Sequence, residues 1–147
     1  MVYHIPALLN ESIDGLNIRP EGIYVDVTFG GGGHSMEILK RLKTGLLIAF
    51  DQDEDARLNA PVDKNFLFLN QNFRFLKNNL RFNKIGSIDG LIADLGVSFH
   101  QFDEPGRGFT FRQDAPLDMR MNKSGQVTAA HLLKILDETS LADVFYN

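Results

Sequence analysis

The segment Asp26–Ser35, DVTFGGGGHS, combines a carboxylate, a hydroxyl, four consecutive glycines and an imidazole. Glycine loses more conformational freedom on folding than any other residue and contributes no side-chain packing, so four in a row are costly. Such a loop is useful where a large polar ligand must approach the backbone closely. An apolar run precedes it and an amphipathic run follows it, which predicts a strand, a loop and a helix. That arrangement holds nucleotide-like ligands at the strand ends of open α/β sheets.

Three ligand classes are compatible with such a loop, and the spacing separates them. A P-loop needs a lysine directly after its last glycine, and the first lysine here is Lys40, which disfavours ATP or GTP hydrolysis. A dinucleotide loop starting at Gly30 and Gly32 would have Ser35 in place of its third glycine. The residues from Asp26 to Gly32 match Asp-x-Gly/Thr-x-Gly-x-Gly, a pattern typical of S-adenosylmethionine (SAM) binding. A glycine-rich surface turn is the alternative that needs no ligand.

Polar residues also follow the other predicted strands. Asp51 ends the second strand about 20 residues beyond the glycines, where an acidic side chain accepts hydrogen bonds from ribose hydroxyls. Asn72 and Phe73 follow the third strand and could recognise the edge and face of an adenine, although helix core is the alternative for Phe73. Asp94 ends the fourth strand. Together these residues predict one crevice at the strand ends.

The strands and helices that would position these residues alternate along the chain. Four short, nearly continuous apolar runs predict strands, and the segments between them have helical spacing, with residues 53–60 the weakest. This alternation predicts right-handed βαβ units and a doubly wound parallel sheet. The predicted strands are Gly22–Phe29, Gly45–Asp51, Asn65–Asn70 and Ile88–Gly96, and the predicted helices cover 35–43, 53–60 and 72–82.

The pattern changes in the last third of the chain. Residues 99–123 are turn-rich and irregular, 127–138 have helical spacing, and 139–147 begin a further helix with Thr139 or Ser140 as its N-cap. We therefore predict a half-domain over residues 1–98 and a second region over 99–147.

The composition excludes several classes of protein. A net charge of −4 argues against a uniformly basic nucleic-acid face, although a local basic patch remains compatible with it. With no cysteine, disulfides and thiolate metal sites are excluded, and no pair of histidines has metal-ligand spacing, so no metal is predicted. Neither a membrane span nor a secretory signal is visible, which makes the cytoplasm the expected compartment.

Four motifs together resemble those of a known family. HIPALLNE, GIYVDVTFGGGGHS, DGLIADLGVS and RGFTFRQDAPLDMRM resemble the MraW family of bacterial small-subunit ribosomal RNA methyltransferases, from His4 to Tyr146. The resemblance implies a Rossmann-like class I SAM-dependent methyltransferase fold, with strand order 3-2-1-4 and the start of a helical insertion. It also implies methyl transfer from SAM to N4 of a cytidine, with small-subunit ribosomal RNA or the assembled subunit as partner.

The resemblance also implies roles for individual residues. Asp94 is the nearest candidate for the catalytic residue, although the Pro-Pro-aromatic motif that follows this position in many amine methyltransferases is absent. The sequence departs from the family at Ser98-Phe99 and at Gly106-Arg107-Gly108, both in the loop that follows Asp94. Cofactor contacts are expected at Gly30, Gly32, Gly33, His34, Asp51, Phe73, Asp94 and Gln101, and RNA contacts at Arg107, Arg112, Arg120 and Lys123, for which a solvated charged loop is the alternative.

The resemblance covers only the N-terminal half of the family, which leaves alternatives open. The chain could be a non-catalytic SAM-binding fragment or paralogue, and an NAD-binding oxidoreductase is a third interpretation. An edge strand at Ile88–Asp94 without lysine or proline predicts pairing with a second copy, so a homodimer through this strand or through the C-terminal helices is expected.

Overall fold

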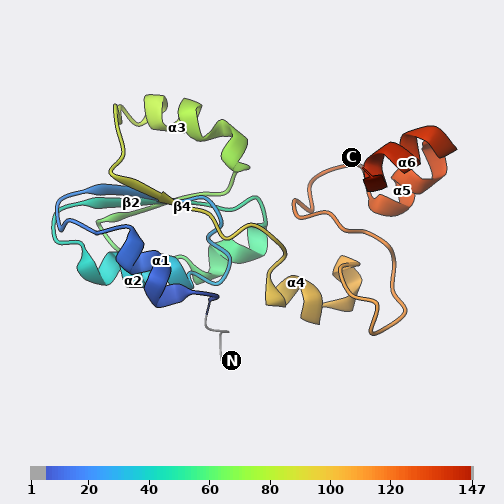
Figure 1. Cartoon of the computed structure of the whole chain (residues 1–147), viewed down its shortest axis with the longest axis horizontal. Coiled ribbons are helices and arrows are strands. Elements are labelled where there is room, and N and C mark those ends of the chain that lie inside the picture. Colours follow the sequence, from blue (N-terminus) through green and yellow to red (C-terminus); the bar gives the residue numbers. More distant parts are fainter. Residues whose placement is uncertain (1–5, 147) are drawn as a thin grey trace. The chain divides into compact units, whose positions relative to one another are not determined.

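The computed structural model describes residues 6–146 and divides the chain into two compact units, Met1–Gly96 and Val97–Asn147. The first unit contains a four-stranded sheet with helices on both faces (Figure 1). The second unit contains short helices and a long irregular segment.

All strand pairs of the sheet are parallel, and the strand order is β3-β2-β1-β4, which confirms the predicted α/β fold and the order 3-2-1-4. In the register of the sheet, Val25 lies between Ile48 and Leu91. The ladders are shorter than the apolar runs because the chain leaves the sheet toward the loops at the carboxyl ends. The strands are β1 (Ile23–Asp26), β2 (Leu46–Phe50), β3 (Phe66–Leu69) and β4 (Gly90–Ile92).

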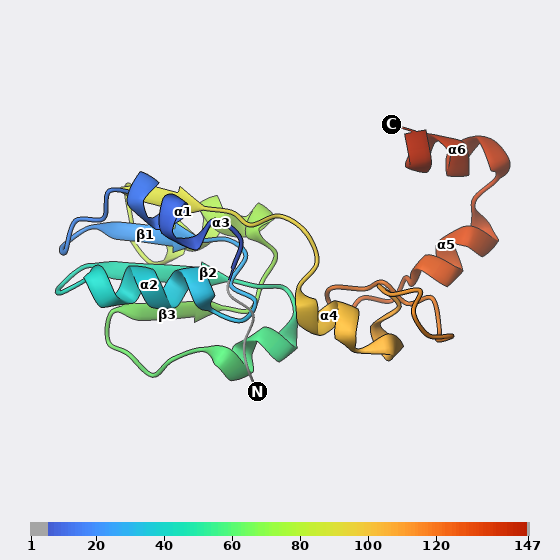
Figure 2. The ribbon, with the colours of Figure 1, turned by 60° about the horizontal axis from the view of Figure 1, so that its bottom comes forward.

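Helices cover the two faces of the sheet unequally. Figure 2 shows α1 and α2 side by side on one face, and Figure 1 shows α3 on the other. The predicted helix over 35–43 is α2, the helix over 72–82 consists of η2 and α3, and 53–60 contains the 3₁₀ helix η1. Helix α1 was not predicted from the sequence; it is short and anchored by Ile13, a fully buried side chain. The bounds are α1 (Leu9–Gly15), α2 (Gly33–Arg41), η1 (Glu54–Asn59), η2 (Phe73–Phe75) and α3 (Leu76–Phe82).

A large hydrophobic cluster lies on each face of the sheet, and a smaller third one contains Phe29, Ala49 and Ala56. Tyr24 points toward α1 and α2, where it joins Ile38, whereas its neighbour Val25 points to the opposite face and joins Leu76 and Leu80. Because successive side chains of a strand alternate between faces, strands covered on both faces need apolar residues at consecutive positions. This explains the nearly continuous apolar runs in the sequence.

The second unit contains α4 (Phe99–Asp103), η3 (Pro105–Arg107), α5 (Ala129–Ile135) and α6 (Glu138–Tyr146). Thr128 caps α5 by accepting a hydrogen bond from the backbone N–H of His131. The predicted N-cap of the last helix at Thr139 or Ser140 is wrong. Asp137 Oδ1 accepts from the backbone N–H of Ser140, so the capping side chain precedes the predicted ones and the helix begins at Glu138. Among residues 6–146, no helix is long and apolar enough to cross a membrane.

The buried face of α2 should dominate the stability of the first unit. Ile38 is completely buried against the sheet, so Ile38→Ala should lower the free energy of unfolding by about 2–5 kcal/mol. Chemical denaturation followed by circular dichroism measures this difference. Leu58→Ala is the control, because Leu58 is 88% exposed and its removal should change stability little. Equal effects of the two substitutions would contradict the packing described here.

Candidate cofactor site

The glycine loop between β1 and α2 uses its glycines for conformation and for close packing. Gly30 and Gly32 have φ angles of 50° and 81°, a region that disfavours residues with a side chain. Gly32 is also the N-cap of α2. A Cβ atom on Gly33 would lie 2.2 Å from Cγ of Pro6, so the chain near the N-terminus packs directly on the loop. The loop is therefore held in shape by its surroundings.

Asp51, at the end of β2, holds the glycine loop. Its Oδ2 accepts a hydrogen bond from the backbone N–H of Gly30 at 2.8 Å, and its Oδ1 accepts from that of Asp53 at 2.9 Å. Burial raises the pKa of the Asp51 carboxyl, and these two backbone hydrogen bonds oppose the rise. Asn59 adds a further restraint by donating to the carbonyl of Gly30 at 3.0 Å. The carboxylate thus fixes the loop at the sheet edge.

A second carboxylate, Asp26, organises the end of β1. It is almost fully buried and accepts from Ser35 Oγ at 2.7 Å and from the backbone N–H of Thr28 at 3.0 Å. The Thr28 hydroxyl oxygen in turn accepts from the backbone N–H of Asp94 at 2.7 Å. Burial raises the pKa of Asp26, and the hydrogen bonds from Ser35 and Thr28 oppose the rise. This network joins α2 and the segment after β4 to the end of β1.

His34 is buried in the loop, and one of its ring nitrogens has no hydrogen-bond partner among the described residues. It is 7% exposed, and its Nε2 atom makes no hydrogen bond within residues 6–146. Buried polar atoms almost always have a hydrogen-bond partner, so an unsatisfied one beside a glycine loop is compatible with a polar ligand at this place. His34 is also one of the cofactor contacts expected from the sequence.

The loops after β2, β3 and β4 bring the remaining predicted residues of the first unit to the same sheet edge. The side-chain amide of Asn72 donates to Gln52 Oε1 at 2.8 Å and so ties the loop after β3 to the loop after β2. Phe73 is 44% exposed, which argues against the alternative that it is helix core. Asp94 lies two residues beyond β4 and is exposed.

Gln101 belongs to the second unit, where it is buried in α4. Its side chain and that of Ser98 form a capping box: Ser98 Oγ accepts from the backbone N–H of Gln101 at 3.2 Å, and Gln101 Oε1 accepts from that of Ser98 at 3.0 Å. The departure from the family at Ser98-Phe99 thus coincides with the start of a helix.

Two of the four predicted RNA-contacting residues hold the irregular segment together. Arg107 is 6% exposed and donates to the carbonyl oxygens of Arg120 and Met121 at 3.0 and 3.3 Å. Arg120 pairs with Asp118 at 2.6 Å and lowers the pKa of that carboxyl to about 2. Position 108 requires a glycine, because a Cβ atom there would lie 2.5 Å from the backbone nitrogen of Asp118.

The other two predicted RNA-contacting residues, Arg112 and Lys123, are exposed.

Among residues 6–146, no group of three or more histidine and acidic side chains could hold a metal ion.

A family model described as the MraW methylase family matches residues 1–147. The chain belongs to this family. The resemblance noted in the sequence is confirmed, and the parallel sheet of order β3-β2-β1-β4 is the Rossmann-like methyltransferase fold that was predicted.

Curated relatives agree with the family model. Proteins named "Ribosomal RNA small subunit methyltransferase H" match this chain at 57% identity over 145 residues in Bacteroides fragilis and at 58% over 146 in Parabacteroides distasonis. A protein of the same name from Flavobacterium johnsoniae is 56% identical over 148 residues. These matches cover 98%, 98% and 100% of this chain but 48%, 48% and 49% of the relatives. The chain therefore spans about half the length of the curated relatives it matches.

Two features of this MraW-family chain were missed by sequence reasoning. Pro6 packs against Gly33, and the only signal for it was its place in the motif HIPALLNE. From the sequence, Ser35 was only the residue at the position of the third glycine of a dinucleotide-binding pattern. In the structure its buried hydroxyl donates a hydrogen bond to Asp26. Contacts between residues distant in sequence leave no periodic signal from which they could be found.

The pH dependence of stability should report the buried carboxyl of Asp26. Because burial raises the pKa of Asp26 above the ordinary value for an aspartate, the folded state binds a proton more readily than the unfolded state. The free energy of unfolding therefore falls as the pH rises from about 4 through the raised pKa, because the buried carboxyl loses its proton. Asp26→Asn removes the charge and can still accept from Thr28 and donate to Ser35. Denaturation at a series of pH values should show that the free energy of unfolding of the variant, relative to that of the wild type, rises toward neutral pH. A difference in free energy of unfolding that does not change with pH would contradict this prediction.

Proposed function

We propose that this chain is the SAM-binding part of a methyltransferase that acts on N4 of a cytidine in small-subunit ribosomal RNA. The observation that carries the proposal is the glycine loop clamped to the sheet edge by Asp51, in a chain of the MraW methylase family. The names of the curated relatives support ribosomal RNA as the substrate. Action on ribosomal RNA would place the chain in the cytoplasm. We assign cofactor binding to residues 1–98 and the start of a helical insertion to residues 99–147.

The residues of the first unit fit SAM. The glycines allow the amino-acid part of the cofactor to approach the backbone, and the unpartnered Nε2 of His34 provides a polar group beside it. Asp51 accepts from the backbone N–H groups of Gly30 and Asp53, and because a carboxylate offers about four lone-pair sites it can also accept from a ribose hydroxyl. The half-exposed ring of Phe73 offers a face for an adenine. Gln101 remains a proposed contact from the second unit.

When bound, SAM would supply a methyl group on a sulfonium, and the chain would position the acceptor amine. An exocyclic amine of cytosine is a poor nucleophile because its lone pair is delocalised into the ring. Asp94 presents an exposed carboxylate whose own backbone N–H is fixed by Thr28, so it can accept a hydrogen bond from an amine and stabilise the positive charge that develops there. We propose Asp94 for this role.

For the RNA backbone we propose Arg112 and Lys123 as phosphate contacts, because both are exposed on the irregular segment. Arg107 and Arg120 would contribute mainly by shaping that segment, since their guanidinium groups bind carbonyl oxygens and a carboxylate. A dinucleotide-binding oxidoreductase is disfavoured, because the position that needs a third glycine holds the buried side chain of Ser35.

Removal of the Asp51 carboxylate should weaken cofactor binding. Asp51→Ala loses acceptors for the ribose hydroxyls and also releases the backbone N–H of Gly30, so affinity for S-adenosylhomocysteine should fall about tenfold to hundredfold. Isothermal titration calorimetry measures this. The control is Glu21→Ala, an exposed carboxylate at the amino end of β1, which should bind as the wild type does. Wild-type binding of NAD without binding of SAM or S-adenosylhomocysteine would refute the proposal, and a non-catalytic fragment would bind SAM without methylating ribosomal subunits.

The edge strand β4 leads us to propose self-association of this chain. In the described residues β4 pairs only with β1, and Leu91 is 42% exposed. An unprotected edge strand invites pairing with another chain. Light scattering at tens of micromolar, in the concentration range where such contacts form, should report a homodimer. Hydrogen exchange should show the amides of residues 88–94 protected in the dimer, and a monomer with the same protection would contradict the proposal.

A further inference from the structure

The basic residues of this acidic chain are unevenly distributed. Of the 15 Lys and Arg residues, five lie in residues 64–88, which contain none of the 19 Asp and Glu residues. Four of the five are on η2, α3 and the turn that follows: Arg74, Lys77, Arg81 and Lys84. The helix that covers one face of the sheet therefore differs in charge from the remainder of the chain.

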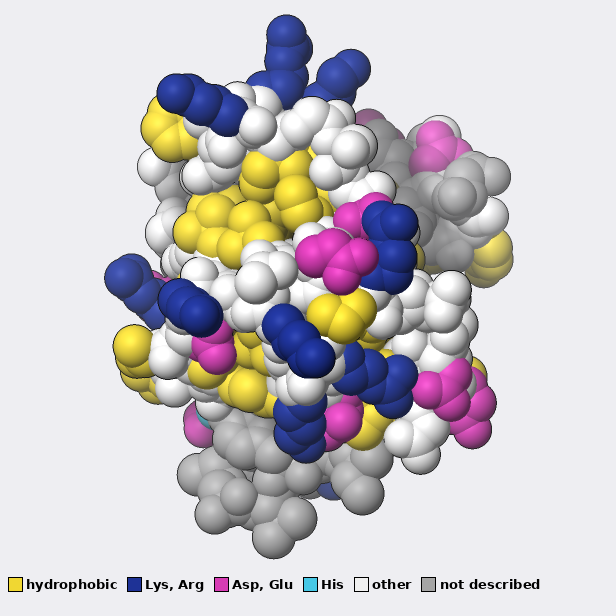
Figure 3. Space-filling model, turned by 90° about the vertical axis from the view of Figure 1, so that its left-hand side faces the viewer, with side chains coloured by type: hydrophobic (Ala, Val, Ile, Leu, Met, Phe, Trp, Pro, Cys, Tyr) yellow, Lys and Arg dark blue, Asp and Glu magenta, His cyan; other side chains and the backbone are white. Residues whose placement is uncertain are grey.

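These four side chains share one face of the helix, because they are spaced three or four residues apart. All four are exposed, and within residues 6–146 none of them pairs with an acidic side chain. Lys and Arg side chains project at the top of Figure 3, where α3 lies, above an exposed hydrophobic area. Such an unpaired cationic row is suited to a polyanion.

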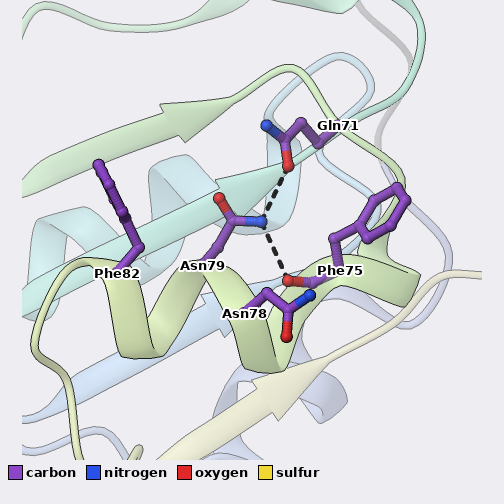
Figure 4. A pocket seen from close by; sticks show the side chains of 5 residues that line it. All are labelled: Gln71, Phe75, Asn78, Asn79 and Phe82. Carbon is purple, nitrogen blue, oxygen red and sulfur yellow. Dashed lines mark hydrogen bonds between the residues drawn. The ribbon is translucent and has the colours of Figure 1, made fainter.

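A pocket adjoins the cationic row on the same helix. It has a volume of about 420 Å³ and is lined by Gln71, Phe75, Asn78, Asn79 and Phe82 (Figure 4). The Phe75 ring is 40% exposed and the Phe82 ring 87% exposed. Neither aromatic side chain belongs to the core, against which Leu76 and Leu80 of the same helix pack.

The side-chain amides that line the pocket differ in their hydrogen bonds. Asn79 Nδ2 donates to Gln71 Oε1 at 2.9 Å and to the carbonyl of Phe75 at 3.0 Å, which fixes the floor (Figure 4). The amide of Asn78 makes no hydrogen bond within the described part of the chain. The guanidinium of Arg74 lies 4.6 Å from the centre of the Phe75 ring and links the pocket to the cationic row.

We propose that this face of α3 binds single-stranded RNA, with an unstacked base in the pocket and neighbouring phosphates on Arg74, Lys77 and Arg81. Exposed aromatic rings stack on bases, amides bind base edges, and the Lys and Arg groups neutralise phosphates. A base has the size for this pocket and can bind the amide of Asn78, whereas an apolar peptide would leave that amide without a partner. The inference rests on the proposed function and adds a docking surface along α3, which runs back from the carboxyl end of the sheet (Figure 1).

Fluorescence anisotropy with a labelled, roughly 12-nucleotide single-stranded RNA tests this on the 147-residue chain. Phe82→Ala should weaken binding about tenfold, because one stacked base is lost. It should leave the fold intact, since the ring is exposed. Lys77→Glu with Arg81→Glu should weaken binding and reduce its dependence on salt. Matched controls are Phe111→Ala, a fully exposed ring of the second unit, and Lys43→Glu, an exposed charge next to the amino end of β2.

Two further measurements separate the possible results. Calorimetry with S-adenosylhomocysteine should give wild-type affinity in all four variants, and failure of wild type to bind it would count against the proposed function but not against this surface. Unchanged RNA affinity in Phe82→Ala and in the charge variant would overturn the inference. Equal competition by double-stranded RNA would overturn the base pocket. A dimer in light scattering that both variants abolish, without any RNA binding, would assign the surface to a second copy.

Discussion

A buried carboxylate at the end of β1 determines the geometry of the sheet edge. Asp26 loses most of its hydration on folding, and a buried charge is tolerated only when its hydrogen-bonding capacity is used. Ser35 and Thr28 satisfy it, and by doing so they attach the first turn of α2 and, through the backbone N–H of Asp94, the segment after β4. The glycine loop lies between these attachments, so its ends are held before any ligand arrives.

Asp51 complements this arrangement from the neighbouring strand. Its carboxylate spans the backbone of the glycine loop and the start of the following turn, which ties β1 to β2 at the place where parallel strands leave room for a ligand. The side chain that we propose as the ribose acceptor is therefore also part of the scaffold. Such pre-organisation lowers the entropic cost of binding, because the loop does not have to be ordered by the cofactor.

Charge separates two regions of the first unit. The sheet edge carries Asp26, Asp51, Asp53 and Asp94, whereas the outer face of α3 carries cations, amides and exposed aromatic rings but no acidic side chain. A cofactor with hydroxyl and ammonium groups suits the first region, and a phosphate backbone suits the second. The net charge of the whole chain does not reveal these two regions, because it sums the acidic sheet edge and the basic face of α3.

The sequence by itself determined the parallel α/β sheet and the family, because apolar runs, glycine spacing and strand-end polar residues are local signals. The strand order followed only from the resemblance to that family. It also indicated Asp51 and Phe73 as polar and aromatic groups at strand ends. Only the tertiary structure decided that Asp51 clamps Gly30, that Pro6 packs on Gly33 and that Arg107 is buried against Arg120 and Met121. These contacts join residues far apart in the chain or depend on a φ angle and on burial, and neither residue type nor spacing reports such quantities. The fold determines which group each charged side chain contacts.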